Sequence, residues 1–504
     1  MSGSDSPERS FVEEQPTQSL SWDEVSPKSN EHGAELVEQK SYLELHTPQI
    51  LTSMETVPDE QDENAPETMC EIFSQSVVPF FLGGCGSISA GLLLTYANKE
   101  MKLLEEVPEF LVLMPPLQGL RGNLDMTFSA RMSTLAHKGA FEKPGIVRKV
   151  WRNAAVAQAL SVFVCIIANL ISLLIVHVSP ELSEVDATNT TFGTNSTSSL
   201  QHSDQTSFLF LTSSSIISMA GNCGLCTLLL FTIVYCTWKR NYNPDNIVAP
   251  LGASVSDLLT IGSMLLVCYM LRPYSEFNNI VPIVIIVLAV WSVPVWIYLS
   301  WKDDTAVKTA RQQCLTLVFA SMVSCGAGYL QSRGAMQFPN YPAYQTLISG
   351  LAGNRGAVLA SRISSHLEVQ KKSELEFKER VWPLTYYKSK TAEARTAKLL
   401  LCTALPFQMF FVGVSTLASF LMKEPVESDY KFFIAYSLVV LIQQSVIIYL
   451  AQLLVYSLWS FGIDPDIHAI PLLTSSADVC GCGLLYLLFL ALNGIFGCVE
   501  TKST

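Results

Sequence analysis

The sequence predicts an all-α polytopic membrane protein of about 11 transmembrane helices, in two parallel pseudo-symmetric five-helix repeats joined by one extra helix. The composition, the long apolar runs and an internal repeat lead to this prediction. Of the 504 residues, 49% are hydrophobic and 15% are charged, whereas soluble domains usually carry about 25% charged residues. Acidic residues outnumber basic ones, 44 to 32, which excludes a basic nucleic-acid-binding protein.

The first element is an acidic tail, residues 1–75. Its part from 1 to 70 holds 16 acidic and 3 basic side chains, so the rest of the chain is close to neutral. The segment is rich in Ser, Glu, Gln and Pro, and it cannot bury enough apolar surface to offset the entropy of ordering. We therefore expect a disordered cytoplasmic tail that binds cytoplasmic partners. It contains no apolar run that would serve as a signal peptide.

The membrane body follows from about residue 76. A helix that crosses a lipid bilayer needs ~20 mostly apolar residues. Eleven segments meet this requirement: 77–97, 109–130, 153–178, 207–237, 248–271, 279–300, 314–331, 344–365, 396–422, 431–458 and 471–493.

The distribution of Lys and Arg predicts the orientation of these spans. With the N-terminus in the cytoplasm, the inside loops hold 19 Lys and Arg side chains and the outside segments hold 7, as the positive-inside rule requires. Two glycosylation sequons, at Asn189 and Asn195, fall in the 180–206 loop, which has no Lys or Arg and is placed outside. We expect a glycoprotein of the plasma membrane.

Two motifs occur twice. The Gly-Leu-x-Gly-Asn sequence of 119–123 returns at 350–354. An Asn/Asp-Pro-Asp sequence with a later Pro-Leu and Asp spans 243–257 and returns at 464–478, with every anchor shifted by the same amount. Two motifs in the same order with fixed internal spacing predict two homologous halves.

The halves divide the membrane body into three parts. Residues 76–271 form the first repeat, 272–312 hold a linking helix and a cytoplasmic loop, and 313–504 form the second repeat. Five spans alone would invert the second half, and the extra span at 279–300 restores its orientation. The repeats are therefore expected to be parallel, with an axis along the membrane normal. Transporters commonly place their substrate sites at such repeat interfaces.

Two aspartates, one inside the fifth span of each half, are the strongest candidates for chemistry. A charge at mid-membrane costs ~2.5–3.5 kcal/mol or more and usually lines an aqueous path. Asp257 and Asp478 each lie seven positions after a proline, Pro250 or Pro471, on nearly the same helix face. Carboxylates and freed carbonyls are hard oxygen ligands that suit Mg²⁺ or Ca²⁺. The alternative is pairing with a buried arginine, for which the candidates are Arg121, Arg355 and Arg362.

The Gly-Leu-x-Gly-Asn motifs supply a second candidate pair. Pro115 and Pro116 precede the first motif and predict a broken helix there, because proline removes a helical hydrogen bond. Non-helical backbone at membrane depth must line a cavity or pack against protein. Asn123 and Asn354 could then offer an amide oxygen to a hydrated ion. The alternative role for both asparagines is that of a helix cap.

One further acid, Asp125, occurs near this motif in the first half only. Its counterpart in the second half is Gly356, so any role for Asp125 breaks the symmetry. Either it binds metal or it pairs with Arg121. The candidate metal ligands are thus Asp257, Asp478, Asn123, Asn354 and Asp125.

The Asn/Asp-Pro-Asp sequences at 243–245 and 464–466 predict helix starts. An Asn or Asp cap, a proline in the first turn and a following acid together satisfy a helix N-terminus. The chain contains no P-loop, no H-E-x-x-H and no G-x-S-x-G sequence, so neither ATP-driven pumping nor an enzymatic activity is expected.

The repeated motifs resemble those of the MgtE-type magnesium transporters and, most closely, of their animal relatives in solute carrier family 41. The resemblance rests on residues 119–127, 243–250, 353–354 with 360–364, and 464–466 with 470–471. It implies Mg²⁺ transport, with coupling to Na⁺ in the animal forms. It also implies that Asp257 and Asp478 match the pore aspartates of that family.

One departure from the family pattern keeps a second hypothesis open. Arg355 stands beside Asn354, where the family has an apolar residue, and an unpaired cation near an ion path would repel Mg²⁺. The alternative is a non-conducting membrane regulator that acts through the acidic tail.

Overall fold

The computed structural model describes the chain from residue 69 to 496 with gaps, and the tail lies almost wholly outside this part. The described residues are 69–100, 109–137, 140–178, 197–240, 245–277, 279–301, 304–338, 340–370, 391–421 and 430–496. They form eleven long α-helices and one short 3-10 helix: α2 (Met69–Glu100), α4 (Glu109–His137), η1 (Ala140–Glu142), α5 (Ile146–Val178), α8 (Thr197–Lys239), α9 (Asp245–Phe277), α10 (Ile280–Ser300), α11 (Asp304–Gln337), α12 (Tyr341–Gln370), α15 (Ala392–Leu421), α16 (Tyr430–Ser460) and α17 (Pro465–Phe496).

The all-helical prediction is confirmed, and each predicted span falls on one of the eleven helices. Nine of the helices in the described part are long and apolar enough to cross a membrane. The other two are α4 and α12, which carry the Gly-Leu-x-Gly-Asn motifs. Most of their side chains between Phe110 and Ser129, and between Tyr341 and Ala360, are buried. Their polar residues therefore face protein instead of lipid.

The broken helix predicted at Pro115 and Pro116 is wrong, because α4 runs without interruption through both prolines. The missing N–H of Pro116 leaves the carbonyl oxygen of Val112 without its helical donor. That oxygen lies against Gly328 of α11, where a Cβ atom would overlap it. The first two turns of α4 thus tolerate the prolines by packing the freed carbonyl against a glycine of another helix.

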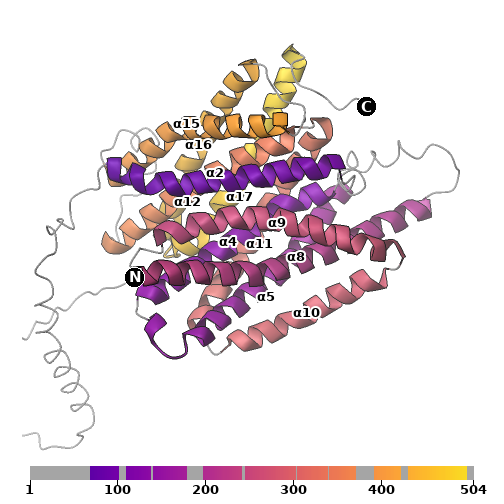
Figure 1. The fold of residues 1–504 in the computed structure, drawn as a ribbon, viewed down its shortest axis with the longest axis horizontal. Coiled ribbons are helices and arrows are strands. Elements are labelled where there is room, and N and C mark those ends of the chain that lie inside the picture. The colour runs from indigo at the N-terminus through magenta and orange to yellow at the C-terminus, as the bar shows by residue number, and fades with distance from the viewer. Residues whose placement is uncertain are drawn as a thin grey trace, which may run out of the picture. The chain divides into compact units, whose positions relative to one another are not determined.

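The two halves repeat one pattern of helix contacts, with α2, α4, α5, α8 and α9 in the first half and α11, α12, α15, α16 and α17 in the second. α2 packs on α9 of its own half and on α12 of the other half, and α11 packs correspondingly on α17 and on α4. Figure 1 shows α2 running between α15 and α9. The first helix of each half is therefore shared by both halves.

Small residues allow this shared packing. Gly91 of α2 faces Ala343 and Thr346 of α12, and a Cβ atom at Gly91 would lie 3.1 Å from the Ala343 carbonyl oxygen. Gly328 faces Val112 in the same way. Position 343 corresponds to position 112 under the shift that relates 350–354 to 119–123, so both close contacts obey the repeat.

The extra helix α10 lies at the edge of the bundle beside α5 and α8. It matches the predicted span 279–300, and only 6% of its apolar window is buried. Such an exposed apolar surface is stable in contact with lipid. Two helix starts also match the prediction, since α17 begins at Pro465 and α9 at Asp245.

Candidate functional site

A cavity lies between the two halves, enclosed by α2, α4, α9, α12 and α17. The volume in which the centre of a water molecule fits is about 70 Å³. One water needs about 10–15 Å³ of such volume, so the cavity has room for several waters. The residues that line it are Ser87, Ala90, Pro115, Gln118, Gly119, Gly122, Asn123, Met126, Asp257, Gln345, Thr346, Ser349, Gly350, Gly353, Asn354, Thr474 and Asp478.

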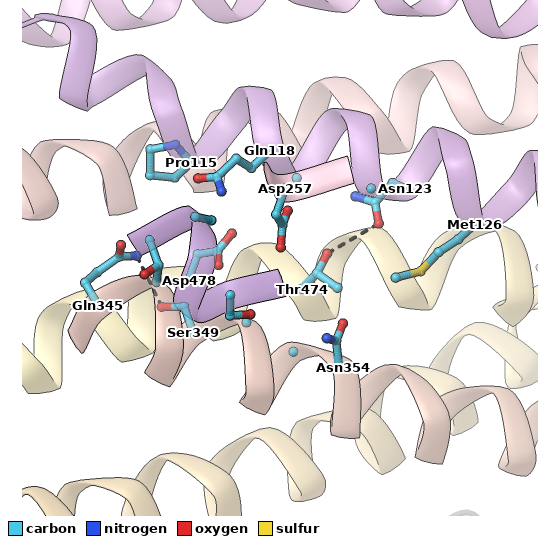
Figure 2. A pocket seen from close by; sticks show the side chains of 17 residues that line it. Pro115, Gln118, Asn123, Met126, Asp257, Gln345, Ser349, Asn354, Thr474 and Asp478 are labelled. Atoms are coloured by element: carbon cyan, nitrogen blue, oxygen red, sulfur yellow. Dashed lines mark hydrogen bonds between the residues drawn. The ribbon is translucent and has the colours of Figure 1, made fainter. Parts of the chain in front are cut away.

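Asp257 of α9 and Asp478 of α17 both line this cavity, and Figure 2 shows both carboxylates beside it. They are close enough to repel each other electrostatically, and the Ser324 hydroxyl of α11 bonds to Asp478. The lack of a side chain at Gly119 opens the space beside Asp478, because a Cβ atom there would lie 4.0 Å from its Oδ2. Two symmetry-related acids therefore face one shared space.

Asn123 and Asn354 also line the cavity, one from each half. Both lie in the middle of a continuous helix, α4 or α12, so their predicted alternative role as helix caps is wrong. The Thr474 hydroxyl donates to the Asn123 amide oxygen at 3.5 Å (Figure 2). Position 474 corresponds to Ala253 in the first half, so this contact between halves has no symmetric counterpart.

Asp125 is not among the residues that line the cavity. Both of its carboxylate oxygens accept hydrogen bonds from Arg121, one turn earlier on α4, and the bond from Nε is 2.9 Å long. Both side chains are buried. The structure thus shows the pairing that the sequence offered as the alternative to metal binding.

The chemistry of the cavity suits a hydrated divalent cation. Its described lining has two carboxylates and no basic side chain, together with amide and hydroxyl oxygens. In the described part of the chain, no three His, Cys, Asp or Glu side chains lie close enough together to hold a metal ion. An ion here would keep much of its water, as Mg²⁺ does when only one or two carboxylates bind it.

Comparison with known proteins identifies the family. The family MgtE, described as a divalent cation transporter, matches residues 114–267 and 345–488, together more than half of the chain. The chain belongs to the MgtE family of divalent cation transporters. It is therefore a multi-pass membrane transporter and not an enzyme.

Several curated relatives span most of this MgtE-family chain. Solute carrier family 41 member 3 of Rattus norvegicus is 28% identical over 433 residues, 84% of this chain and 88% of that protein. The Mus musculus member 3 is 27% identical, over 92% of this chain and 89% of its own length. Solute carrier family 41 member 2 of Homo sapiens is 28% identical, over 82% and 69%. No solved structure matches.

Arg355 is the residue of this MgtE-family chain that raised the regulator hypothesis. It is 1% exposed, and its Nε and Nη2 have no hydrogen-bond partner in the described part of the chain. The guanidinium lies over the rings of Phe80 and Phe407, with its central carbon 5.4 and 5.9 Å from their centroids. It is not among the cavity-lining residues, so its position does not favour the regulator hypothesis.

Several polar residues that line the cavity, such as Gln345 and Ser349, were not predicted from the sequence as site residues. Gln345 lines the cavity and donates to Cys482 Sγ at 3.2 Å and to Ser349 Oγ at 3.4 Å. A third repeated motif was available as a signal, because Ser-x-x-Ala-Gly occurs at 87–91 and again at 324–328. Its serines lie beside the two Gly-Leu-x-Gly-Asn motifs, Ser87 at Gly350 and Ser324 at Gly119.

Proposed function

We propose that this MgtE-family protein transports Mg²⁺ through the cavity between its two halves. The observation that carries the proposal is the convergence of Asp257 and Asp478 on one cavity without a basic lining residue. Two carboxylates balance the charge of one divalent ion. The description of the family as a divalent cation transporter and the hard oxygen ligands support a small divalent metal over a soft one.

In this proposal the ion enters with most of its water. Mg²⁺ demands octahedral geometry at about 2.0–2.1 Å and dehydrates reluctantly. The carboxylates bind it directly or through water, and the amide oxygens of Asn123 and Asn354 accept hydrogen bonds from its waters. The space for several waters supports this arrangement. Asp125 stays a predicted ligand, although Arg121 already occupies its oxygens.

The proposed topology has eleven spans, including the buried helices α4 and α12. Residues 76–271 and 313–504 form parallel repeats, residues 272–312 link them, and the N-terminus is cytoplasmic. The exchange of α2 and α11 between halves supports the repeats, and the 19 to 7 distribution of Lys and Arg supports the orientation. The plasma membrane and the coupling to Na⁺ are part of the same proposal.

Flux in liposomes tests the proposal. Purified protein is reconstituted with a Mg²⁺-sensitive dye inside, with and without an opposing Na⁺ gradient. We expect flux that Asp257→Asn with Asp478→Asn abolishes, while Glu142→Gln, an exposed acid outside the cavity, leaves it intact. Flux only with the Na⁺ gradient indicates an exchanger, and flux without it a channel. Unchanged flux in the folded double variant would contradict the proposal.

A further inference from the structure

A second and larger hollow lies on the outside of the bundle, between α5, α8 and the extra helix α10. The volume in which the centre of a water molecule fits is about 320 Å³ here, compared with about 70 Å³ in the central cavity. The walls are almost entirely apolar. Several of the lining side chains, among them Trp151 and Leu228, are exposed on the surface of the bundle. The groove is named here the α10 groove, and its main residues are Trp151, Ala154, Gly224, Leu228, Phe231 and Trp296.

Two tryptophans mark the end of the α10 groove at which α5 begins. The rings of Trp151 and Trp296 lie 6.3 Å apart, one on α5 and one on α10. Tryptophan is enriched at the boundary between lipid hydrocarbon and water. Arg148 and Lys149 are exposed on the same turns of α5. The groove therefore runs from the membrane interface toward the hydrocarbon.

A basic hollow lies at the same end of α10, where α10 leads into α11. It is lined by Trp301, Lys308 and Arg311 among others and has an open volume of about 350 Å³. Trp301 follows Trp296 by five positions, which is about 7.5 Å along a helix. Neither Lys308 nor Arg311 forms an ion pair with an acid in the described part of the chain. Two cationic groups thus line a hollow that Trp301 borders, at the end of α10 that also carries Trp296 of the groove.

We propose that the α10 groove and the basic hollow together bind one anionic phospholipid. An acyl chain lies in the groove, and the headgroup phosphate contacts Lys308 and Arg311. The charge arrangement carries this assignment, because basic residues at the membrane interface attract anionic lipids and arginine binds phosphate oxygens in a bidentate manner. The basic end of α10 is the predicted cytoplasmic end, where anionic lipids are concentrated.

The sequence of α8 and the extra helix α10 together account for the space in the groove. Gly224 of α8 has no atom within 4 Å of where a Cβ would stand, so the groove floor lacks a side chain. Among the described helices of the second half, none corresponds to α10, so the wall that α10 gives the groove has no repeat counterpart there. The proposal concerns a lipid site outside the central cavity and does not depend on which ion is transported.

Quenching of tryptophan fluorescence by brominated lipid tests the site. The full chain is reconstituted into phosphatidylcholine vesicles with increasing fractions of phosphatidylserine that carries brominated acyl chains, and a parallel series uses brominated phosphatidylcholine. We expect saturable quenching at a low fraction of the serine lipid. Trp151→Phe and Trp296→Phe should each reduce the quenched component, which assigns it to the groove. Equal quenching by both lipids would overturn the proposal.

Matched variants separate the two parts of the site. Gly224→Phe should abolish the saturable component by filling the groove, whereas Gly221→Phe should not, because that glycine is also unobstructed but does not line the groove. Lys308→Gln with Arg311→Gln should lower the preference for the serine lipid about fivefold per charge removed. A preference that survives both glutamines, or quenching that a sterol reverses and unlabelled phosphatidylserine does not, would overturn the assignment.

Discussion

The two halves surround the cavity with corresponding contacts, but they differ in the charges behind it. Each half provides an aspartate, an asparagine and a glycine against which the other half packs. Behind the cavity, the second half places Arg355 against Phe80. The corresponding positions hold Leu124 in the first half and Leu317 in the second, both buried. Where position 355 is arginine, its partner is the aromatic Phe80. Where the corresponding position 124 is leucine, the counterpart of Phe80 is also a leucine.

The two halves also differ in buried charge at a second pair of positions on α4 and α12. The first half has the buried ion pair of Arg121 with Asp125, where the second half has Ala352 and Gly356. A Cβ atom at Gly356 would lie 2.7 Å from a side-chain carbon of Ile447, so the second half has no room for an acid there. The aspartates, asparagines and glycines that face the cavity therefore recur in both halves, whereas Thr474 and the positions behind the cavity do not.

The first prediction concerns the glycine of α11, which contacts the backbone of α4. Gly328→Ala places a methyl group on the backbone carbonyl of Val112, whereas Gly91→Ala meets first the movable side chain of Thr346. Overpacking typically costs about 1–3 kcal/mol, and more when backbone must shift. We expect Gly328→Ala to lower the melting temperature in detergent more than Gly91→Ala does. Equal shifts would show that the two contacts are equivalent.

Exchanging the residues behind the cavity should have a larger effect than the glycine variant. Leu124→Arg buries a guanidinium at a position where the counterpart of Phe80 is Leu317, and an uncompensated buried charge costs about 3–5 kcal/mol. The reverse change, Arg355→Leu, should be stabilising or neutral. Unfolding followed by tryptophan fluorescence checks both variants. If Leu124→Arg leaves the free energy of unfolding unchanged, a buried arginine at this position does not need an aromatic neighbour, and the account is contradicted.

The ion pair of the first half provides a test of Asp125. Asp125→Asn should destabilise the protein by about 3–5 kcal/mol, because it leaves Arg121 buried without a counter-charge. Arg121→Met with Asp125→Val replaces the whole pair by apolar side chains of similar volume and should recover most of that stability, with Mg²⁺ flux retained. If the double variant is stable but carries no flux, Asp125 acts as a ligand after all.

The smallest effect should come from the contact between halves at Thr474. Thr474→Ala introduces the residue of the first half, Ala253, and removes one long hydrogen bond to Asn123. A neutral hydrogen bond contributes about 0.5–1.5 kcal/mol. The half-saturating Mg²⁺ concentration should therefore rise by less than about tenfold, as measured in the liposome assay. A complete loss of flux would give Thr474 a direct role.

Periodicity and the repeat predict most of the fold, because apolar length and fixed spacing are local properties of the sequence. All eleven helices and both aspartates of the cavity follow from them. The break at Pro115 does not occur, because Gly328, far away in the sequence, accommodates the freed carbonyl of Val112. The place of Arg355 likewise depends on Phe80 and Phe407, which come from two other helices. Such contacts are visible only in the folded chain.

The central claim is that Asp257 and Asp478 share one Mg²⁺ ion, and a double-mutant cycle on Mg²⁺ binding tests it most directly. Calorimetry on the purified chain compares Asp257→Asn, Asp478→Asn and the combined variant. If both carboxylates bind one ion, each single variant should weaken binding about tenfold or more. The combined loss should then fall short of the sum by about 0.5–3 kcal/mol. Strictly additive losses would show two independent sites and contradict the shared cavity.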